Sequence, residues 1–489
     1  MRSSRSFWLM ALLSALGYLV LLLWMPLAPH AAPTPRPDVS AFAPWPWGTL
    51  AYAALLAGLL YAYWRAYRLI VTGQARPSLV AIMLPAALFC AFLVAAFPIN
   101  ALDIYNYLIL GRLEAVFRQN PYLLAPAGIL NDPFLKYAGE WGKDVSNYGP
   151  VFHHIARWLA SISRDNLLLG LLLFKGLAAL VFLASAGLIW LVLRGQPPQV
   201  RAARTLLWAW NPALLLIFAM DGHNDGLMLI WLLLGLLVMR RGQAVPGFTL
   251  MALAPLTKFS GVLPIPFLLL AALRALPDLR ARLRLLLLTA LGMAAVTWLV
   301  FLPYGSPLVL LQRLARSATG AGYSPLTIIL LTGQRVGLPL TREQLATAGV
   351  ALFVLICLGL LVCTWRGRSA LRAAADSTAA YLVLSLSFRI WYPAWVFPWV
   401  LLDAPQDDPA AQRSSARRLA AGNWFLLTAQ FSVLVYGQLR VALLHGDRYW
   451  AHLLGVSLVF ILPLVLAWLG VAPTPPVDSH TSNAEQIND

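Results

Sequence analysis

Charged residues are scarce in this chain of 489 residues. Only 11% of its residues are Asp, Glu, Lys or Arg, whereas 60% are hydrophobic. A soluble domain needs about a quarter of charged residues to cover its surface, so this composition argues against a soluble fold. Acidic residues are scarcer than basic ones, 19 against 36, which gives a formal net charge of +17.

Cysteine is also rare, and no secretory cleavage site is evident. Cys90, Cys357 and Cys363 lie in or at the ends of apolar segments, without the spacing of a metal site or a disulfide framework. The first apolar run, residues 7–27, could be a signal peptide, but the stretch Met25-Pro-Leu-Ala-Pro-His30 at its end is a poor small-residue cleavage site. We therefore expect this run to be retained as a membrane span.

Long apolar runs dominate what is present. Residues 7–27, 166–193 and 450–469 are each close to the ~20 residues that cross a bilayer as a helix. None of them alternates between polar and apolar residues as a strand would. The sequence predicts an all-α, polytopic membrane protein with about 12–14 transmembrane helices. The expected spans are 7–27, 49–71, 79–97, 166–193, 205–220, 225–239, 285–303, 345–365, 377–389, 392–403, 419–439 and 450–470.

Basic residues lie in short clusters between these apolar segments, and such loops stay on the cytoplasmic side. The positive charge therefore indicates topology and a lipid environment, and no aromatic-interleaved basic face predicts nucleic-acid binding. The pattern predicts one transmembrane domain, residues 1–472, with both termini cytoplasmic. Residues 98–165 and 304–344 form long external loops, and 473–489 form a disordered cytoplasmic tail. The clusters are Arg2 and Arg5; Arg65, Arg68 and Arg76; Arg194, Arg201 and Arg204; Arg240 and Arg241; Arg274, Arg280, Arg282 and Arg284; Arg366, Arg368 and Arg372; and Arg413, Arg417 and Arg418.

Two apolar segments contain internal breaks. Residues 246–273 are interrupted near Pro255, Lys258 and Gly261, and residues 377–403 are interrupted at Pro393. We interpret the first as a helical hairpin with its tip directed outward, and the second as a similar pair.

Asp103 is the first polar residue of interest, because it stands where the chain leaves the third span on the external side. A carboxylate at this place could accept a proton from a hydroxyl group as a general base. Asp is also a favoured N-cap residue, and a helical pattern follows it. Both interpretations remain open on position alone.

The loop that follows is rich in residues that suit sugar binding. Asn side chains bind hydroxyl groups and aromatic rings cover apolar sugar faces, although Asn-Pro and Gly-Pro pairs are also common turns. The candidate substrate-binding residues of this loop are Tyr105, Tyr107, Arg112, Asn120, Tyr122 and Tyr148.

A second polar cluster separates two later apolar segments. Asp221, His223, Asn224 and Asp225 lie within five residues. One histidine and two carboxylates specify a metal only weakly, and a turn rich in Asx residues explains part of the pattern. Because four such groups exceed what a turn needs, we assign them to substrate binding.

Two cations lie inside the broken segments. Lys258 and Arg389 stand among apolar residues, where an ionised group needs an anionic partner. The planar guanidinium of Arg389 suits a phosphate. The alternative is that both side chains snorkel to the membrane interface. A base, a sugar-binding loop and cations at membrane depth together fit glycosyl transfer from a lipid-phosphate donor.

The ordered motifs resemble those of GT-C fold glycosyltransferases, and most of all bacterial polyprenyl-phosphate-mannose-dependent α-mannosyltransferases. The resemblance covers residues 95–310, and hydropathy alone extends it to the C-terminal third. The residues that carry it are Asp103-Ile-Tyr-Asn-Tyr, Gly111-Arg112, Asn120-Pro121-Tyr122, Tyr148-Gly149-Pro150, Asn211-Pro212, Gly222-His223-Asn224-Asp225 and Lys258-Phe259.

This resemblance implies an inverting transfer of a hexose, expected to be mannose, to a glycolipid or lipid-linked acceptor on the external face. Asp103 matches the family's catalytic base, and Lys258 and Arg389 are expected to contact the donor phosphate. No metal and no cofactor are expected, because Asp103 is followed by Ile and Tyr rather than by a second carboxylate. The rival functions are a lipid or sugar flippase, which the absence of internal repeats disfavours, and a non-catalytic scaffold.

Overall fold

The computed structural model describes residues 2–32, 38–317, 322–404 and 409–470. Within these ranges the regular elements are helices, apart from one isolated antiparallel bridge between Pro26 and Ala96. The prediction of an all-α fold is therefore confirmed. The predicted disordered tail, residues 473–489, lies outside the described residues.

The N-terminal half is a bundle of long apolar helices. Helix α1 packs against α4 and α5, α5 packs against α8, and α8 packs against α11. These helices are apolar around most of their circumference, as expected for segments surrounded by other helices and lipid. Their bounds are α1 (Arg2–Trp24), α2 (Leu27–His30), α3 (Val39–Phe42), α4 (Trp47–Val71), α5 (Leu79–Ala95), α8 (Leu167–Val192), α9 (Pro198–Ala209), α10 (Pro212–Leu215), η4 (Leu216–Met220) and α11 (Asp225–Arg240).

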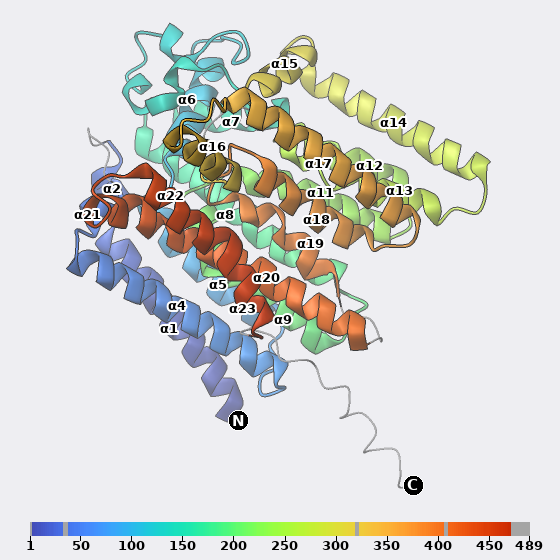
Figure 1. The fold of residues 1–489 in the computed structure, drawn as a ribbon, viewed down its shortest axis with the longest axis horizontal. Helices are drawn as coiled ribbons and strands as arrows, with labels where there is room; N and C mark the ends of the chain where they lie inside the picture. The colour runs from blue at the N-terminus through green and yellow to red at the C-terminus, as the bar shows by residue number, and fades with distance from the viewer. Residues whose placement is uncertain (1, 33–37, 318–321, 405–408, 471–489) are drawn as a thin grey trace.

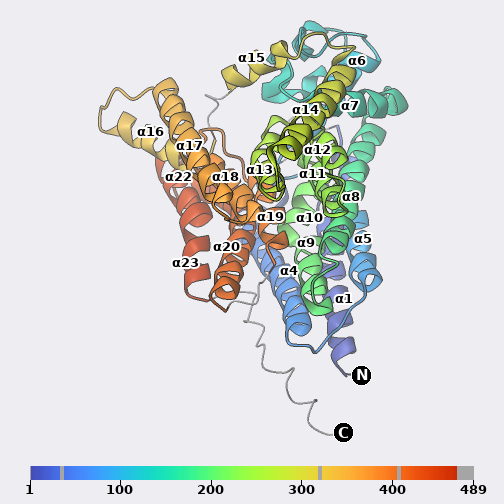
Figure 2. The same cartoon turned by 90° about the vertical axis from the view of Figure 1, so that its right-hand side faces the viewer.

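The predicted external loop 98–165 is folded. Helices α6 and α7 lie against each other, and Gly111 of α6 allows this because a Cβ at its position would lie 2.3 Å from the carbonyl oxygen of Ala156. Figures 1 and 2 show these two helices together with α15 (Leu308–Ser317) at the end of the molecule opposite the N-terminus. The elements of the loop are α6 (Asp103–Ala115), η1 (Pro126–Gly128), η2 (Leu135–Tyr137), η3 (Gly139–Lys143) and α7 (Pro150–Ser163).

The two segments with predicted breaks are indeed interrupted. A proline has no N–H to continue a helical ladder and disfavours helical geometry in the residue before it. The freed backbone near Lys258 is paired by protein, as irregular backbone at membrane depth requires: Gly149 and Val151 donate to Thr257 and Leu256 over 3.0 and 2.9 Å. The elements are α12 (Ala244–Met251), η5 (Phe259–Val262) and α13 (Ile265–Arg274), then α18 (Ala370–Leu384), η6 (Tyr392–Trp395) and α19 (Phe397–Leu402).

The remaining helices include two that face outward. In the most apolar stretches of α14 and α17 only 11% of the residues are buried. Such apolar, exposed helices are suited to contact with lipid tails. The bounds are α14 (Leu279–Phe301), α16 (Pro325–Arg335), α17 (Arg342–Trp365), α20 (Pro409–Leu434), η7 (Val435–Leu439), α21 (Arg440–Ala442), α22 (Arg448–Val456), η8 (Ser457–Ile461) and α23 (Leu462–Trp468).

The number of spans differs from the prediction of 12–14. Among the described residues, six helices are long and apolar enough to cross a membrane, or up to seven with the bent pair Pro198–Ala209 and Pro212–Met220. The chain is a multi-pass membrane protein by this composition. The expected count was higher because several apolar segments form helices too short to span alone, such as α5 with 17 residues and α11 with 16, and because the broken segments divide into short pieces.

Candidate active site

The polar cluster 221–225 is buried at the start of α11. It follows a break in which α9 and the α10–η4 helix meet at 43°. Asn211 opens α10, because its Oδ1 accepts hydrogen bonds from the N–H groups of Ala213 and Leu214. Asp225 is the first residue of α11, where the helix dipole favours a negative charge. The side chains of this cluster therefore stand on the ends of rigid helices.

His223 lies between two carboxylates. Its Nδ1 is 3.9 Å from Oδ2 of Asp103 and 3.9 Å from Oδ2 of Asp225. Burial lowers the pKa of His223 to about 3, although the Asp225 charge opposes that shift. The imidazole is therefore neutral at neutral pH. The structure thus brings Asp103, from the predicted external loop, to the cluster 120 residues later.

Several polar atoms of this group have no hydrogen-bond partner among the described residues. They are both ring nitrogens of His223, Nδ2 of Asn224 and Oδ2 of Asp225. Buried polar groups are nearly always paired, so each exception calls for an explanation. Donors and acceptors gathered beside Asp103 suit the hydroxyl groups of a sugar, which can serve as both donor and acceptor.

Lys258 has the anionic partner that its position demands. Its Nζ lies 2.8 Å from Oδ1 of Asp225, and the same oxygen accepts a hydrogen bond of 2.5 Å from Nε1 of Trp395. The ammonium also lies 5.3 Å from the ring centres of Tyr392 and Trp395. An ion pair and two aromatic faces keep the cation in the site, so snorkelling to the interface does not describe Lys258.

The segment after α18 adds aromatic residues that the sequence interpretation did not select. The ring of Trp391 stacks on His223 at 4.1 Å between centroids, and Tyr392 stacks on Trp395 at 4.0 Å. The sequence did carry a signal for them: three of the five residues 391–395 are aromatic, and this stretch begins two residues after Arg389. Arg389 itself lies 6.0 Å from the ring centre of Trp141 and has no carboxylate within 4.0 Å among the described residues.

Asp221 binds Asn100 and so holds the chain that leads to Asp103. Its carboxylate accepts from the backbone N–H of Asn100 over 3.3 Å and from Nδ2 of Asn100 over 2.9 Å. Lys175, buried in α8, donates to the carbonyl of Ala96. Gly222, with a φ of +71°, lies against Ile104, where a Cβ would meet the side chain at 2.7 Å. Residues 96–104 are thus fixed at both ends, which sets the position of Asp103.

The tyrosines of α6 point in different directions. The hydroxyl of Tyr107 donates to Oδ1 of Asn224 over 3.2 Å, and its ring meets that of Tyr148 edge-on at 5.4 Å. Tyr107 therefore belongs to the polar group around His223. The hydroxyl of Tyr105 instead donates to the carbonyl of Ala31 over 2.9 Å.

Arg112, Asn120 and Tyr122 stabilise the loop and are not among the contacts of the group around His223. Arg112 is buried, forms ion pairs with Asp132 at 3.0 Å and Asp165 at 3.1 Å, and packs on the ring of Phe134. Asn120 donates to the carbonyl of Tyr304 over 3.2 Å, and Tyr122 donates to the carbonyl of Tyr148 over 2.9 Å. These contacts place the chain around Tyr148 beside the break that carries Lys258.

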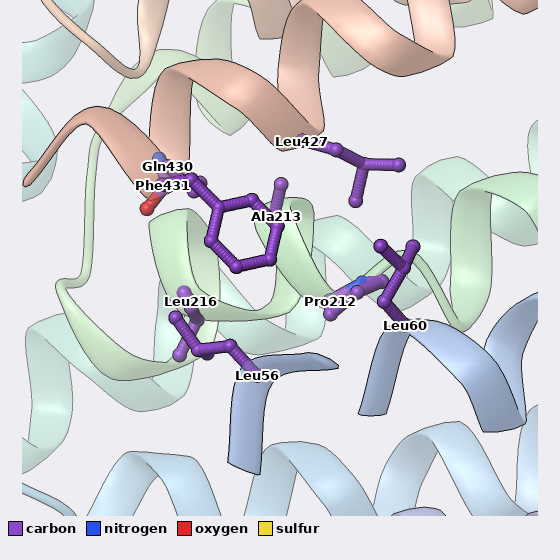
Figure 3. Close-up of a pocket in the computed structure, with 8 residues that line it drawn as sticks. All are labelled: Leu56, Leu60, Pro212, Ala213, Leu216, Leu427, Gln430 and Phe431. Atoms are coloured by element: carbon purple, nitrogen blue, oxygen red, sulfur yellow. The ribbon is translucent and has the colours of Figure 1, made fainter. Parts of the chain in front are cut away.

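Figure 3 shows a separate apolar crevice where α4, α10, η4 and α20 meet. Gln430 is the one hydrogen-bonding side chain in its lining, and no charged residue lines it, so it offers no group for acid–base chemistry or phosphate binding. Its lining residues are Leu56, Leu60, Pro212, Ala213, Leu216, Leu427, Gln430 and Phe431. Among the described residues, no group of three or more His, Cys, Asp or Glu side chains is arranged to hold a metal ion.

Comparison with known proteins gives the site its context. A family model described as "Alpha-(1->6)-mannopyranosyltransferase, N-terminal domain" matches residues 10–274, more than half of the chain. The chain belongs to this mannopyranosyltransferase family. The matched range contains Asp103, His223 and Lys258, whereas Arg389 lies beyond it.

Relatives within this family are distant in sequence. Alpha-(1->6)-mannopyranosyltransferase A of Mycobacterium tuberculosis is 28% identical over 357 residues, which cover 68% of this chain and 66% of the relative. Alpha-(1->6)-mannopyranosyltransferase B of Corynebacterium glutamicum is 26% identical over 420 residues, 78% of this chain and 66% of the relative. The chain thus spans just under two thirds of the length of each.

Proposed function

We propose that this protein is a membrane mannosyltransferase that transfers mannose from a polyprenyl-phosphate donor to a lipid-linked or glycolipid acceptor at the external face. One observation supports this above the others: Asp103 lies in a buried polar group with His223, Asp225 and Lys258. The membership of the mannopyranosyltransferase family favours mannose as the sugar. The basic clusters between spans favour an external site.

In the proposed reaction, Asp103 accepts the proton of the acceptor hydroxyl as its oxygen attacks C1 of mannose. The new glycosidic bond forms while the bond from C1 to the phosphate oxygen breaks, and the electron pair leaves with polyprenyl phosphate. The attack from the opposite face inverts the configuration at C1. Neutral His223, 3.9 Å from Asp103, is suited to orienting the hydroxyls that meet this carboxylate.

Lys258 and Arg389 would stabilise the negative charge that develops on the departing phosphate. Cations fixed before the reaction act without reorganisation in a site that excludes water. The ion pair with Asp225 and the surrounding rings hold Lys258 in place. Arg389 has no carboxylate partner within 4.0 Å among the described residues, so its charge remains available for a phosphate.

The test uses purified protein in detergent with polyprenyl-phosphate-[¹⁴C]mannose and a glycolipid acceptor extract, comparing wild type with Asp103→Asn. We expect radiolabel to enter glycolipid with wild type and to fall by about 10²–10⁴-fold in the variant, as for loss of a general base. Equal thermal unfolding of the two proteins excludes misfolding. Transfer that survives the substitution would remove Asp103 from this role, and lipid movement without consumption of the donor would favour a flippase.

A further inference from the structure

A crevice runs between α17 and α18, beside the segment that carries Arg389. From α17 it is lined by Ala346, Gly349, Val350 and Phe353, which share one helix face by their spacing of three and four residues. The crevice is partly open to its surroundings, and about 70 Å³ of it is free for water-sized molecules. Its other lining residues are Tyr381, Leu384, Ser385, Leu386 and Ser387.

The helical part of the lining is apolar except for Tyr381, and the remaining polar lining residues are the two serines of the loop. The hydroxyls of Ser385 and Ser387 lie 3.0 Å apart and hydrogen-bond to each other, so they do not disturb the apolar interior. Val350 is 55% exposed at the edge of the crevice, and Leu355 and Leu358 extend an exposed apolar surface along the same helix. An apolar chain in the crevice could therefore continue into the bilayer without crossing polar surface.

The crevice shares a wall with the candidate active site. Tyr381 lines it and stacks on Trp395 with centroids 6.3 Å apart. Trp395 donates a hydrogen bond to Asp225 and stacks on Tyr392. Asp225 and Tyr392 in turn both contact Lys258. Arg389 follows Ser387 by two residues, so the segment that lines the loop end of the crevice continues to the cation proposed to bind the donor phosphate.

We propose that this crevice binds the isoprenoid chain of the lipid-phosphate donor, with the donor phosphate at Arg389. This inference rests on the proposed function and extends it to a site for the lipid. The donor's tail must remain in an apolar medium while its phosphate reaches the group around His223, and the crevice connects the two. The cation at its loop end matches the phosphate of the donor rather than the hydroxyl of the acceptor.

Ala346→Phe tests the proposal, because it fills the crevice from α17. The matched control is Ala348→Phe, which places the same ring on an exposed position of the same helix. We expect Ala346→Phe to raise the KM for polyprenyl-phosphate mannose by about tenfold, since several buried CH₂ groups would lose their contacts, while the KM for the acceptor stays unchanged. A rise in the acceptor KM alone, or equal effects of the two variants, would overturn the assignment.

A second measurement is independent of turnover. Polyprenyl phosphate with a diazirine on its isoprenoid chain is photolysed with the Asp103→Asn protein, and the labelled peptides are mapped by mass spectrometry. We expect label on 346–353 and 381–387, and much less in Ala346→Phe than in Ala348→Phe. Label elsewhere would contradict the proposal. If the crevice is labelled but wild type transfers no mannose, the lipid site stands and the proposed reaction fails.

Discussion

The two oxygens of Asp225 have different surroundings. Oδ1 contacts Lys258 and Trp395, whereas Oδ2 lies 3.9 Å from Nδ1 of His223 and has no hydrogen-bond partner among the described residues. One oxygen therefore fixes the cation and the other is left for a bound molecule. Under the proposed function, this division would let one carboxylate hold the cation that meets the donor phosphate and also accept a hydrogen bond from the sugar.

Removal of Lys258 alone should be more damaging to stability than removal of both partners. Lys258→Met leaves the buried Asp225 carboxylate without its counter-ion, which typically costs about 3–5 kcal/mol. We expect Lys258→Met with Asp225→Asn to recover most of the lost thermal stability in detergent while mannose transfer remains low. Recovery of activity in the double variant would show that Lys258 serves structure alone.

Asp221 provides a pH-dependent contribution to stability. Burial raises its pKa from 3.8 to about 7, against the opposing hydrogen bonds from Asn100 and the charge of Lys175, and the Asp103 charge adds to the rise. The folded state therefore binds more protons than the unfolded state between pH 4 and 7, so this residue's contribution to stability falls as pH rises through that range.

Asp221→Asn should flatten this dependence. We expect the thermal unfolding temperature of the variant to change less between pH 5 and pH 8 than that of wild type, with buffer and detergent held constant. The variant should also show a larger fall in kcat than in affinity for the donor, because the contact between Asp221 and Asn100 positions Asp103 and not the donor. An unchanged pH profile would place the pKa of Asp221 outside this window.

Single residues with unusual chemistry could be selected from the sequence. Asp103, His223, Asp225 and Lys258 are polar groups among apolar ones, where their cost points to a role, and they lie together in the structure. Arg112 looked the same in sequence, yet the structure pairs it with Asp132 and Asp165. Its partners are 20 and 53 residues away, and no local pattern announces such a contact.

Breaks between helices position the candidate site more directly than the helices themselves do. The break before Lys258 is paired with the start of α7, and Gly149 lies so close that a Cβ would stand 2.0 Å from the carbonyl oxygen of Leu256. Prolines made both breaks predictable. The sequence could not show that the first break would be completed by backbone from a loop a hundred residues earlier.

Gly149→Ala should therefore displace Lys258 without touching it. Overpacking of this kind typically costs about 1–3 kcal/mol, and we expect lower thermal stability together with a raised donor KM. The control is Gly187→Ala in α8, where a Cβ would have open space and helix propensity favours alanine. Equal behaviour of the two variants would mean that the contact between Gly149 and Leu256 does not position the lysine.

At the scale of the whole molecule, the orientation in the membrane is open to direct measurement. In a cysteine-free background, Leu130→Cys lies on an exposed part of the predicted external loop, and Arg194→Cys lies in a predicted cytoplasmic loop. We expect a membrane-impermeant maleimide to label the first in intact cells and the second only after permeabilisation. The reverse result would place the candidate site on the cytoplasmic side.

The two cations assigned to the donor phosphate come from different parts of the chain. Lys258 lies within residues 10–274, which match the family, and Arg389 lies beyond them on the segment next to the crevice between α17 and α18. Under the proposed assignments, the lipid crevice lies wholly in the C-terminal part of the chain. The acid–base group around Asp103 lies in the N-terminal part, and Trp391 and Trp395 pack against that group from the C-terminal part. Replacing the C-terminal third with that of a relative could change which carrier lipid is accepted while the linkage formed stays the same.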